Sequence, residues 1–566
     1  MESERPNVVF ILTDNQGAWS LGCYGNPDIK TPHIDRLARD GTLFRHAYAN
    51  NAVCSPTRAT LLTGLMPCQH GVHCYLSAGR LQIGPQASNT LAEFPTLPSL
   101  LAEQGYVCGL SGKWHLGDNL HPQEGFSFWT TKPHGSSKGF YDQQIIENGQ
   151  MRIEPKYLTD YWTDRGIEFI EKNRQRPFFL MLAYNGPYGL GGTLDEPIRN
   201  RHAETYGDAE LPSFPRIEPH PWNFNYANRI GDLKAIRKYA AEVSGIDDGV
   251  GRMLATLERL GLADNTLVVF TADQGLSGGH SGFWGMGDHT RPLTAFDWTM
   301  HVPLIIKQPR GVAAGRTVDS AVSHIDFLPT MCDLLRLHIP DDAPAKSPGN
   351  SYVGMLSNKL HGDWDEDIYY EFENVRAIRT PGWKYIERFG QSPNEFYNCA
   401  QDPGETKNLI DDPNHSALIG LLRDRMHRWF ADVADPKWDI WNGGRSKSHL
   451  MMAKVFAQAN AERKQPVTTD DAKSGDATSN GEAGFTPSPL EVPQGYTVEM
   501  AAAPSLVAHP LMACFDEQGR LYVAANAGEN LPRAELEQRL PNLVQRLEDT
   551  DGDGVFDRAT TFADKM

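Results

Sequence analysis

A cysteine and an arginine lie four residues apart in the run "NNAVCSPTRATLLTG", which occupies residues 50–64. If a helix begins here, Cys54 lies just before its N-terminus, where free backbone N–H groups and the helix dipole favour an anion. Arg58, about one turn further on, can then reach back to the same place. The residue types leave two interpretations open, a nucleophilic thiol with a lowered pKa and a buried structural cysteine.

The residues that follow Cys54 predict this helix. Ser55 is suited to the N-cap, and Pro56 is suited to the first helical position, where a missing N–H costs nothing. We expect Leu61 and Leu62 to face the core and Gly64 to end the helix. The sequence therefore predicts that a short helix holds the cysteine at its N-terminal end.

Two continuous apolar runs each end at an aspartate, "NVVFILTD" at Asp14 and "NTLVVFTAD" at Asp273. Strands that are apolar on both faces are typical of a parallel sheet buried between helix layers. Further apolar runs lie at 177–185 and 302–307, and a helical pattern lies at 239–262. This alternation predicts a doubly wound, mostly parallel α/β sheet, with both aspartates beyond the carboxyl ends of strands, where such sheets bind ligands.

The composition excludes several classes of protein. The 566 residues include 53 Lys+Arg and 71 Asp+Glu, and the net charge of −18 disfavours a nucleic-acid or anionic-membrane surface. Eight scattered cysteines without a CxxC pair suit neither a disulfide scaffold nor a zinc site. No apolar run approaches the roughly 20 residues of a membrane span, and the N-terminus has no separate apolar signal region. We expect a cytoplasmic protein, or a periplasmic or secreted one if a signal peptide has been removed.

Shifts in composition predict four parts of the chain. A large α/β domain at 5–375 is followed by a smaller α+β subdomain at 376–461, where short strands precede a helix. Residues 462–489 contain a single aromatic residue among Asp, Ser, Thr, Gly, Ala and Pro, which predicts a disordered linker. Residues 490–566 have strand patterns and form a partial, β-rich tail.

The tail contains an acidic run, "DTDGDGVFD", in which Asp549, Asp551, Asp553 and Asp557 surround a glycine turn. Alternating carboxylates suit Ca²⁺, but position twelve is Thr560 instead of the bidentate glutamate of an EF-hand. A Ca²⁺ site and a solvated acidic turn are both left open. Together with "GRLYVAAN", the run resembles the opening of large β-propeller, dehydrogenase-like domains that are fused to enzymes in some bacteria.

The segment "CSPTRATLLTG" resembles the signature of the formylglycine-dependent (type I) sulfatases of the alkaline phosphatase superfamily. In that family the Cys, Pro and Arg of a CxPxR core direct oxidation of the cysteine to an aldehyde. Other family motifs are matched in the right order by "NVVFILTDNQG", "GNPDIKTPHIDRLARDGTLF", "GKWHLG", "VVFTADQG" and "EFYNCAQDPGETKNL". The resemblance covers about residues 5–440 and marks 5–375 as the catalytic domain.

The resemblance implies a nucleophile made from Cys54, the hydrate of a formylglycine that a formylglycine-generating enzyme installs. It implies one Ca²⁺ or Mg²⁺ ion, held by oxygen ligands from Asp14, Asn15, Asp273 and Gln274. It also implies that one residue orients the diol, one neutralises a sulfate oxygen and one acts as a base. These residues are, in that order, Arg58, Lys113 and His115.

Two positions depart from the family pattern. Tyr188 replaces a usual histidine and Met286 a usual lysine, and both of the lost groups would contact sulfate or protonate the leaving oxygen. We expect His289 or Arg291 to supply the missing charge. We expect His280 or Tyr188 to supply the missing proton donor at the substrate. The alternative is that these are ordinary loop residues.

The sequence therefore predicts a sulfuric ester hydrolase that cleaves aryl or carbohydrate sulfates, with a sulfated small molecule or glycan as substrate. One alternative is a phosphonate or phosphate ester hydrolase of the same superfamily. Another is a catalytically weak relative that binds sulfate esters or glycans, which Tyr188 and Met286 motivate. Four aromatic residues could line a sugar pocket or only pack in the core: Trp162, Tyr188, Trp222 and Tyr226.

Overall fold

The protein was analysed as a computed structural model, in which the chain forms two compact units, Met1–Pro466 and Val467–Met566. The structure describes residues 5–77, 81–307, 314–357, 364–391, 393–463, 510–515, 520–525, 543–550, 556 and 558–563.

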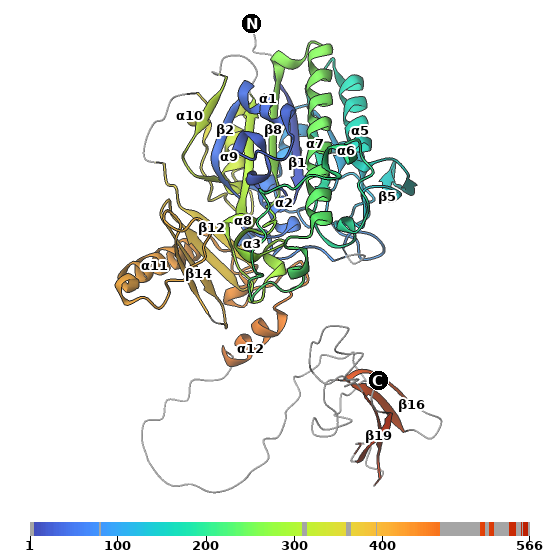
Figure 1. The fold of residues 1–566 in the computed structure, drawn as a ribbon, viewed down its shortest axis with the longest axis vertical. Coiled ribbons are helices and arrows are strands. Elements are labelled where there is room, and N and C mark those ends of the chain that lie inside the picture. Colours follow the sequence, from blue (N-terminus) through green and yellow to red (C-terminus); the bar gives the residue numbers. More distant parts are fainter. Residues whose placement is uncertain are drawn as a thin grey trace. The chain divides into compact units, whose positions relative to one another are not determined.

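A large sheet forms the centre of the first unit, and the described residues contribute eleven strands to it (Figure 1). Across the sheet the order is β10 (Arg316–Val318), β2 (Thr42–Tyr48), β9 (His301–Lys307), β8 (Thr266–Ala272), β1 (Asn7–Asp14), β7 (Phe178–Pro187), β3 (Val107–Gly112), β4 (Phe126–Thr131), β5 (Gln143–Glu147) and β6 (Gln150–Glu154), and β11 (Val322–Ser323) also pairs with β2. The strands from β8 to β4 are parallel, whereas β9, β5 and β6 are antiparallel to their neighbours. This mostly parallel sheet confirms the predicted fold class and all four predicted strands.

The two faces of the sheet are covered by different helices. Val9 and Ile11 of β1 belong to one apolar core, and Val8, Phe10 and Leu12 belong to the other. The first core is closed by α1 (Pro32–Asp40), α5 (Leu158–Asn173) and α7 (Leu233–Arg259), and the second by α2 (Cys54–Thr63), α4 (Leu97–Glu103) and α9 (Phe327–Leu335). Burial of each large apolar side chain contributes about 1.5–3 kcal/mol, which explains why β1 is apolar on both faces.

Adjacent parallel strands bring the two predicted aspartates together. β1 and β8 pair in register, with Thr13 opposite Ala272. Asp14 ends β1, and Asp273 directly follows β8, so their side chains emerge side by side at the carboxyl edge of the sheet. The predicted position of both aspartates at this edge is confirmed.

Helix α2 begins two residues earlier than expected. Val53 is its N-cap and Cys54 its first residue, so the prediction that Ser55 caps the helix is wrong. The Ser55 hydroxyl instead donates to the carbonyl of His115 (2.8 Å) and accepts the N–H of Leu76 (3.0 Å). The Ser55 hydroxyl, which the local pattern assigns to the helix cap, is thus used in hydrogen bonds to distant segments. All ten residues of α2 are buried, and Gly64 ends the helix with φ of +67°, as predicted.

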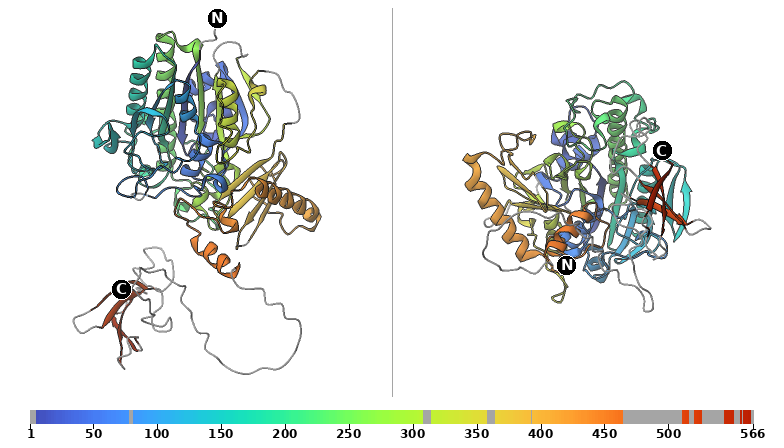
Figure 2. Two further views of the ribbon diagram at one scale, coloured as in Figure 1. Left: turned by 180° about the vertical axis from the view of Figure 1, so that it is seen from behind. Right: turned by 90° about the horizontal axis from the view of Figure 1, so that it is seen from below.

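The smaller subdomain of the first unit is an antiparallel sheet covered by one helix. Its strands are β12 (Ile368–Phe372), β13 (Val375–Arg379), β14 (Trp383–Arg388) and β15 (Glu395–Asn398), and α11 (Ser416–Val433) lies across one face (Figure 2). The hairpin β12–β13 crosses the predicted boundary between residues 375 and 376. Short helices complete the unit: α3 (Pro67–His70), α6 (Ala203–Tyr206), α8 (Asp297–Met300), α10 (Val353–Leu356) and α12 (Ala453–Arg463).

A buried group of charges ties the subdomain to the central domain. Lys384 of β14 is fully buried, and its ammonium pairs with Asp297 of α8 and with Glu405 Oε1 at 2.6 Å. Arg379 of β13 donates to the other oxygen of Asp297 at 2.9 Å. Because such charges are stable in the interior only when they are paired, each member depends on the others.

The second unit contains an antiparallel sheet in which each strand pairs with the next, β16 (Pro510–Phe515), β17 (Leu521–Ala525), β18 (Leu543–Glu548) and β19 (Arg558–Ala563). Val523, Leu547 and Phe556 form its small core. Thr560 lies in β19 and pairs with Arg546. Most of the predicted linker, and Asp551, Asp553 and Asp557 of the acidic run, lie outside the described residues, so the predicted Ca²⁺ site there stays a prediction.

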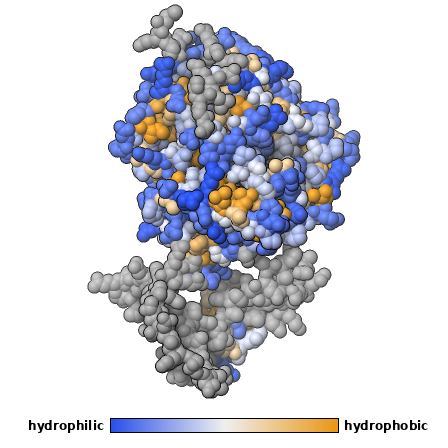
Figure 3. All heavy atoms as spheres, turned by 90° about the vertical axis from the view of Figure 1, so that its left-hand side faces the viewer, coloured by the Kyte–Doolittle hydropathy of each residue, from blue (hydrophilic) through white to orange (hydrophobic). Residues whose placement is uncertain are grey.

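On the face of the first unit seen in Figure 3, hydrophobic side chains form small, separate patches among hydrophilic ones. None of the helices that the structure describes has both the length and the apolar character needed to cross a membrane.

Candidate active site

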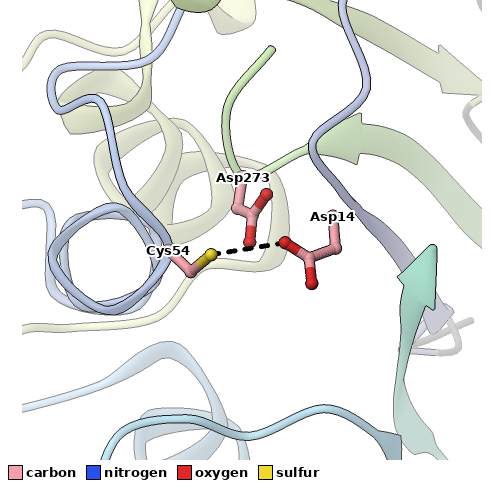
Figure 4. Close-up of side chains that lie close together, drawn as sticks. All are labelled: Asp14, Cys54 and Asp273. Carbon is pink, nitrogen blue, oxygen red and sulfur yellow. Dashed lines mark hydrogen bonds between the residues drawn. The ribbon is translucent and has the colours of Figure 1, made fainter. Parts of the chain in front are cut away.

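Cys54, Asp14 and Asp273 converge at the carboxyl edge of the central sheet (Figure 4). They come from the start of α2, the end of β1 and the residue after β8, and one sulfur or oxygen atom of each lies within 4.8 Å of those of the others. The Cys54 thiol donates to Asp14 Oδ1 at 3.3 Å. All three side chains are buried, so the cluster forms a shielded, anionic centre.

Two cations balance the two carboxylates. Arg58 donates from Nε to Asp273 Oδ2 (3.0 Å), its Nη2 lies 2.9 Å from the same oxygen, and its Nη1 donates to the carbonyl of Lys113 (2.7 Å). The Lys113 ammonium lies 2.7 Å from Asp14 Oδ2. Every one of these charges is buried and paired, which is the condition for keeping ions in an apolar interior.

The oxygen-rich set around Asp14 and Asp273 fits a hard divalent cation. The backbone N–H groups of Asn15 (3.2 Å) and Gln274 (2.9 Å) donate to Asp273 Oδ1, which fixes that carboxylate. Gln274 Nε2 contacts both Asn15 Oδ1 and Cys54 Sγ. Gln274 Oε1 is buried and accepts no hydrogen bond from the described residues. Two carboxylates and two amide oxygens are the ligands that Ca²⁺ and Mg²⁺ prefer.

His115 is held as a neutral base. Its Nε2 lies 2.9 Å from the carbonyl of Leu76, so Nε2 carries the proton and Nδ1 is left as an acceptor. Nδ1 is buried and has no partner among the described residues. Burial, and then the charge of Lys113, hold the pKa of His115 well below its usual value. The ring also packs on Gly135, where any Cβ would lie 2.1 Å from it.

A pocket of about 600 Å³ opens onto this cluster. Five of the predicted site residues line it: Cys54, Lys113, His115, Tyr188 and His289. The two carboxylates and Arg58 lie behind Cys54 and Lys113, in contact with them. The arrangement provides an anion site with a nucleophile position, a neutral base and a buried group suited to a cation.

The family model described as sulfatase matches residues 6–337, which is more than half of the chain. The chain belongs to the sulfatase family. A second model, described as the C-terminal part of N-sulphoglucosamine sulphohydrolase, matches residues 289–432. Residues 486–566 match a domain of unknown function, so the resemblance of the tail to a propeller domain stays a prediction.

Several relatives of this sulfatase are described by names that refer to amino sugars. An N-acetylglucosamine-6-O-sulfatase of Bacteroides thetaiotaomicron is 28% identical over 519 residues, which cover 77% of this chain and 89% of the relative. A solved structure described as a complex with its substrate, D-glucosamine-2-N,6-O-disulfate, is 25% identical, with a TM-score of 0.60 and coverage of 76% and 98%. A phosphonate monoester hydrolase of Agrobacterium radiobacter, 22% identical, shares the fold with a TM-score of 0.60 and coverage of 76% and 97%.

Tyr188 and Met286, the two departures from the family pattern, both lie in the site of this sulfatase. The Tyr188 N–H donates to the carbonyl of Asp14 (3.0 Å), its own carbonyl accepts from Asn15 Nδ2 (2.8 Å), and its ring lies 5.7 Å from the Lys113 ammonium. Met286 Sδ lies 3.4 Å from Gln274 Nε2. A phenol and a thioether thus occupy this side of the pocket.

His280 and Arg291 are not among the residues that line the pocket, so it is the other member of each predicted pair, Tyr188 and His289, that reaches it. His280 lies 2.6 Å from the Ser277 carbonyl and stacks on Trp298 with ring centroids 4.0 Å apart. Arg291 donates to the carbonyls of Asp288 (2.8 Å) and Thr290 (2.7 Å). Both side chains are used in packing and holding the loop, whereas His289 of the same segment does reach the pocket.

Lys132 is a residue of this region that no sequence pattern singles out. It is buried, and its ammonium donates to Ser136 O (3.0 Å) and Ser137 Oγ (2.7 Å), both in the loop that lines the pocket beside His115. Within the described part of the chain it has no carboxylate partner at ion-pair distance. Burial, and then the charge of Lys113, lower the pKa of Lys132 from 10.5 to about 7.

We expect Lys132→Met to change how stability depends on pH. Below about pH 7, Lys132 is protonated in both the folded and the unfolded parent protein. The folded state is then destabilised by the full free-energy cost of burying the ammonium charge. Between about pH 7 and pH 10 the unfolded chain binds the extra proton, so the free energy of unfolding of the parent rises by up to about 1.4 kcal/mol per pH unit relative to Lys132→Met. Urea unfolding of both proteins across this range measures the difference. Lys156→Met, at an exposed position, serves as control, and an unchanged difference would contradict the prediction.

Proposed function

We propose that this sulfatase hydrolyses sulfate monoesters through a formylglycine made from Cys54, with one Ca²⁺ or Mg²⁺ ion. The observation that carries the proposal is the position of Cys54 beside the two carboxylates, in the wall of a pocket that Lys113 also lines. Burial, and then the charge of Asp14, hold the pKa of the Cys54 thiol well above its usual value, so a thiolate nucleophile is disfavoured. A hydrated aldehyde at the same carbon can act as the nucleophile without a thiolate.

Formation of the aldehyde oxidises Cβ of Cys54 by two electrons and releases the sulfur as sulfide. The formylglycine-generating enzyme therefore has to supply an oxidant, such as molecular oxygen. Water then adds to the aldehyde and gives a geminal diol.

In the first step of hydrolysis, one diol oxygen attacks the sulfur of the ester and the bond from sulfur to the alcohol oxygen breaks. In the second, the other hydroxyl gives its proton to a base, the aldehyde re-forms and sulfate leaves with the first oxygen. Together, these steps consume one ester and one water molecule and release one alcohol and one sulfate.

The residues present assign the proton transfers. His115 Nδ1, a buried acceptor without a partner among the described residues, is the base of the second step. Tyr188 is the proton donor to the leaving alcohol, because burial, and then Asp14, raise the pKa of its phenol well above 10 and keep it protonated. Lys113 neutralises a sulfate oxygen and Arg58 orients the diol. His289 supplies a further polar contact in place of the missing lysine.

Four residues would hold the cation: Asp14, Asn15, Asp273 and Gln274. When bound, it supplies positive charge that polarises the sulfate and lowers the pKa of the diol. The unpartnered Gln274 Oε1 supports this assignment.

Mass spectrometry of the peptide that contains Cys54 tests the proposal directly. Protein from a host with a formylglycine-generating enzyme should carry an aldehyde in place of the thiol, and protein from a host without the enzyme should not. An unmodified thiol in both preparations, together with full activity, would overturn the mechanism.

Phosphonate or phosphate ester hydrolysis is the second candidate, which the shared fold of the phosphonate monoester hydrolase favours. A comparison of kcat/KM for an aryl sulfate and the matching aryl phosphonate separates the two. A third candidate, a binding protein of low activity, is favoured by Met286 and Tyr188 at the leaving-group side. It predicts tight binding of a sulfate ester without turnover, even when the aldehyde is present.

Removal of divalent cations is expected to abolish activity and to lower the thermal midpoint of unfolding by a few degrees. An ion that binds only the folded state stabilises it by mass action. Treatment with EDTA followed by Ca²⁺ or Mg²⁺ should restore both properties in the parent but not in Asp273→Asn. If the EDTA-treated parent kept its activity and its thermal midpoint, the proposed cation would be wrong.

A further inference from the structure

Asp288 contributes a carboxylate to the wall of the pocket. It lies in the single turn η7 (Gly287–His289), and its side chain is only 10% exposed. Oδ1 is buried and accepts no hydrogen bond from the described residues. His289 Nδ1 lies 3.0 Å away, but this nitrogen already accepts the N–H of Met286 at 3.2 Å, so in a neutral ring both atoms are acceptors.

A buried carboxylate oxygen without a donor costs about 1–3 kcal/mol, so a ligand that donates a hydrogen bond to it would be favoured. We propose that Asp288 is a specificity-determining residue that accepts a hydrogen bond from a hydroxyl group on the alcohol part of the substrate. The inference rests on the proposed function, because that function places the sulfate at Cys54.

Contacts in the site connect Asp288 to the nucleophile. Gln274 Nε2 lies 3.2 Å from Cys54 Sγ and 3.4 Å from Met286 Sδ. Met286 directly precedes the turn that carries Asp288. A group bound at Asp288 is therefore a near neighbour of a sulfate bound at Cys54. The pocket volume of about 600 Å³ leaves room for both.

The distribution of charge in the pocket fixes the direction of the substrate. Two cations line the pocket, Lys113 and Lys138, and Asp288 is the one carboxylate among the described residues that do so. It repels a sulfate and attracts hydrogen-bond donors. The sulfate end is thus directed to Lys113 and the hydroxyl-bearing end to Asp288.

The neighbours of Asp288 suit a sugar ring. Tyr75 and Tyr226 line the same pocket, and Tyr226 is fixed by a hydrogen bond from the Gly191 N–H to its phenol oxygen (3.0 Å). Aromatic rings offer apolar surface to the C–H faces of a pyranose, while its hydroxyls can reach a carboxylate. An aryl sulfate without hydroxyls would leave Asp288 buried and without a donor.

The test compares two substrates, N-acetylglucosamine 6-sulfate and nitrophenyl sulfate. We expect Asp288→Ala to lower kcat/KM for the sugar sulfate by about 10- to 100-fold and to change that for the aryl sulfate by less than about threefold. Removal of the contacting hydroxyl from the sugar should lower kcat/KM of the parent protein by a similar factor. The same change in the sugar should leave kcat/KM of Asp288→Ala unchanged. Asp142→Ala, at an exposed position, is the matched control.

The proposal would be overturned if Asp288→Ala lost the same factor in kcat/KM with both substrates. It would also be overturned if every deoxy sugar changed kcat/KM of the parent and of Asp288→Ala by the same factor. The aryl sulfate activity and the thermal midpoint of Asp288→Ala report whether it folds. If the parent hydrolyses neither ester, the proposed function fails, and calorimetry with Cys54→Ala decides the role of Asp288. Sugar sulfate binding that is tenfold weaker in Cys54→Ala/Asp288→Ala supports the proposal, whereas equal affinity or no binding to either protein overturns it.

Discussion

Replacing Cys54 with alanine is expected to lower kcat for sulfate ester hydrolysis by a factor of about 1,000 or more. The alanine cannot become an aldehyde, so no diol forms in front of Lys113 and His115. The protein should still fold, because the Cys54 side chain is small and makes only weak sulfur hydrogen bonds, one donated to Asp14 and one accepted from Gln274. Steady-state rates and a thermal unfolding curve measure the two effects.

Serine at the same position separates the two steps. A serine hydroxyl can attack sulfur but lacks the second hydroxyl that expels sulfate, so Cys54→Ser should release about one equivalent of alcohol and stop. Cys68→Ala, at a buried cysteine of another apolar cluster, is the control and should keep full activity. Sustained turnover by Cys54→Ala would show that the nucleophile lies elsewhere.

Replacing Lys384 with methionine is expected to lower the free energy of unfolding of the first unit by about 3–5 kcal/mol. Methionine has similar length but leaves the fully buried Glu405 without its cation, and Asp297 with Arg379 alone. The uncompensated carboxylate costs more than the lost ion pair itself. Urea unfolding, followed by the fluorescence of the tryptophans, measures the loss.

A surface ion pair provides the matched control for Lys384. Lys172 pairs with Glu168 on α5 and is 65% exposed, so Lys172→Met should cost less than about 1 kcal/mol. If the two variants were equally stable, the buried charges would not hold the subdomain in place.

The parts of the site that could be predicted are those that lie in continuous segments. The apolar strands fix Asp14 and Asp273, because the ends of two adjacent parallel strands have to meet. Lys113 and His115 follow β3 directly, and its pairing with β7 brings them to the same edge. Here local pattern and tertiary structure agree.

The parts that could not be predicted depend on side-chain partners from distant segments. Residues 280–291 contain two histidines and an arginine, but His280 stacks on Trp298 and Arg291 donates hydrogen bonds to two backbone carbonyls. Asp288 is not indicated by the family pattern, because the group that this pattern lacks in the segment is a cation and Asp288 is a carboxylate. Lys132 has no spacing that distinguishes it from a surface lysine, and only its burial reveals it.

If Cys54 is matured as proposed, the complete burial of α2 limits the time in which this can happen. Cys54 is 4% exposed, and the side chains around it, including Pro56 and Arg58, are enclosed as well. An enzyme that reads the Cys-x-Pro-x-Arg core needs that segment extended and accessible. If the aldehyde is installed, installation and folding compete for the same nascent chain. The active fraction of a preparation then reports the ratio of two rates, and slower folding would raise it.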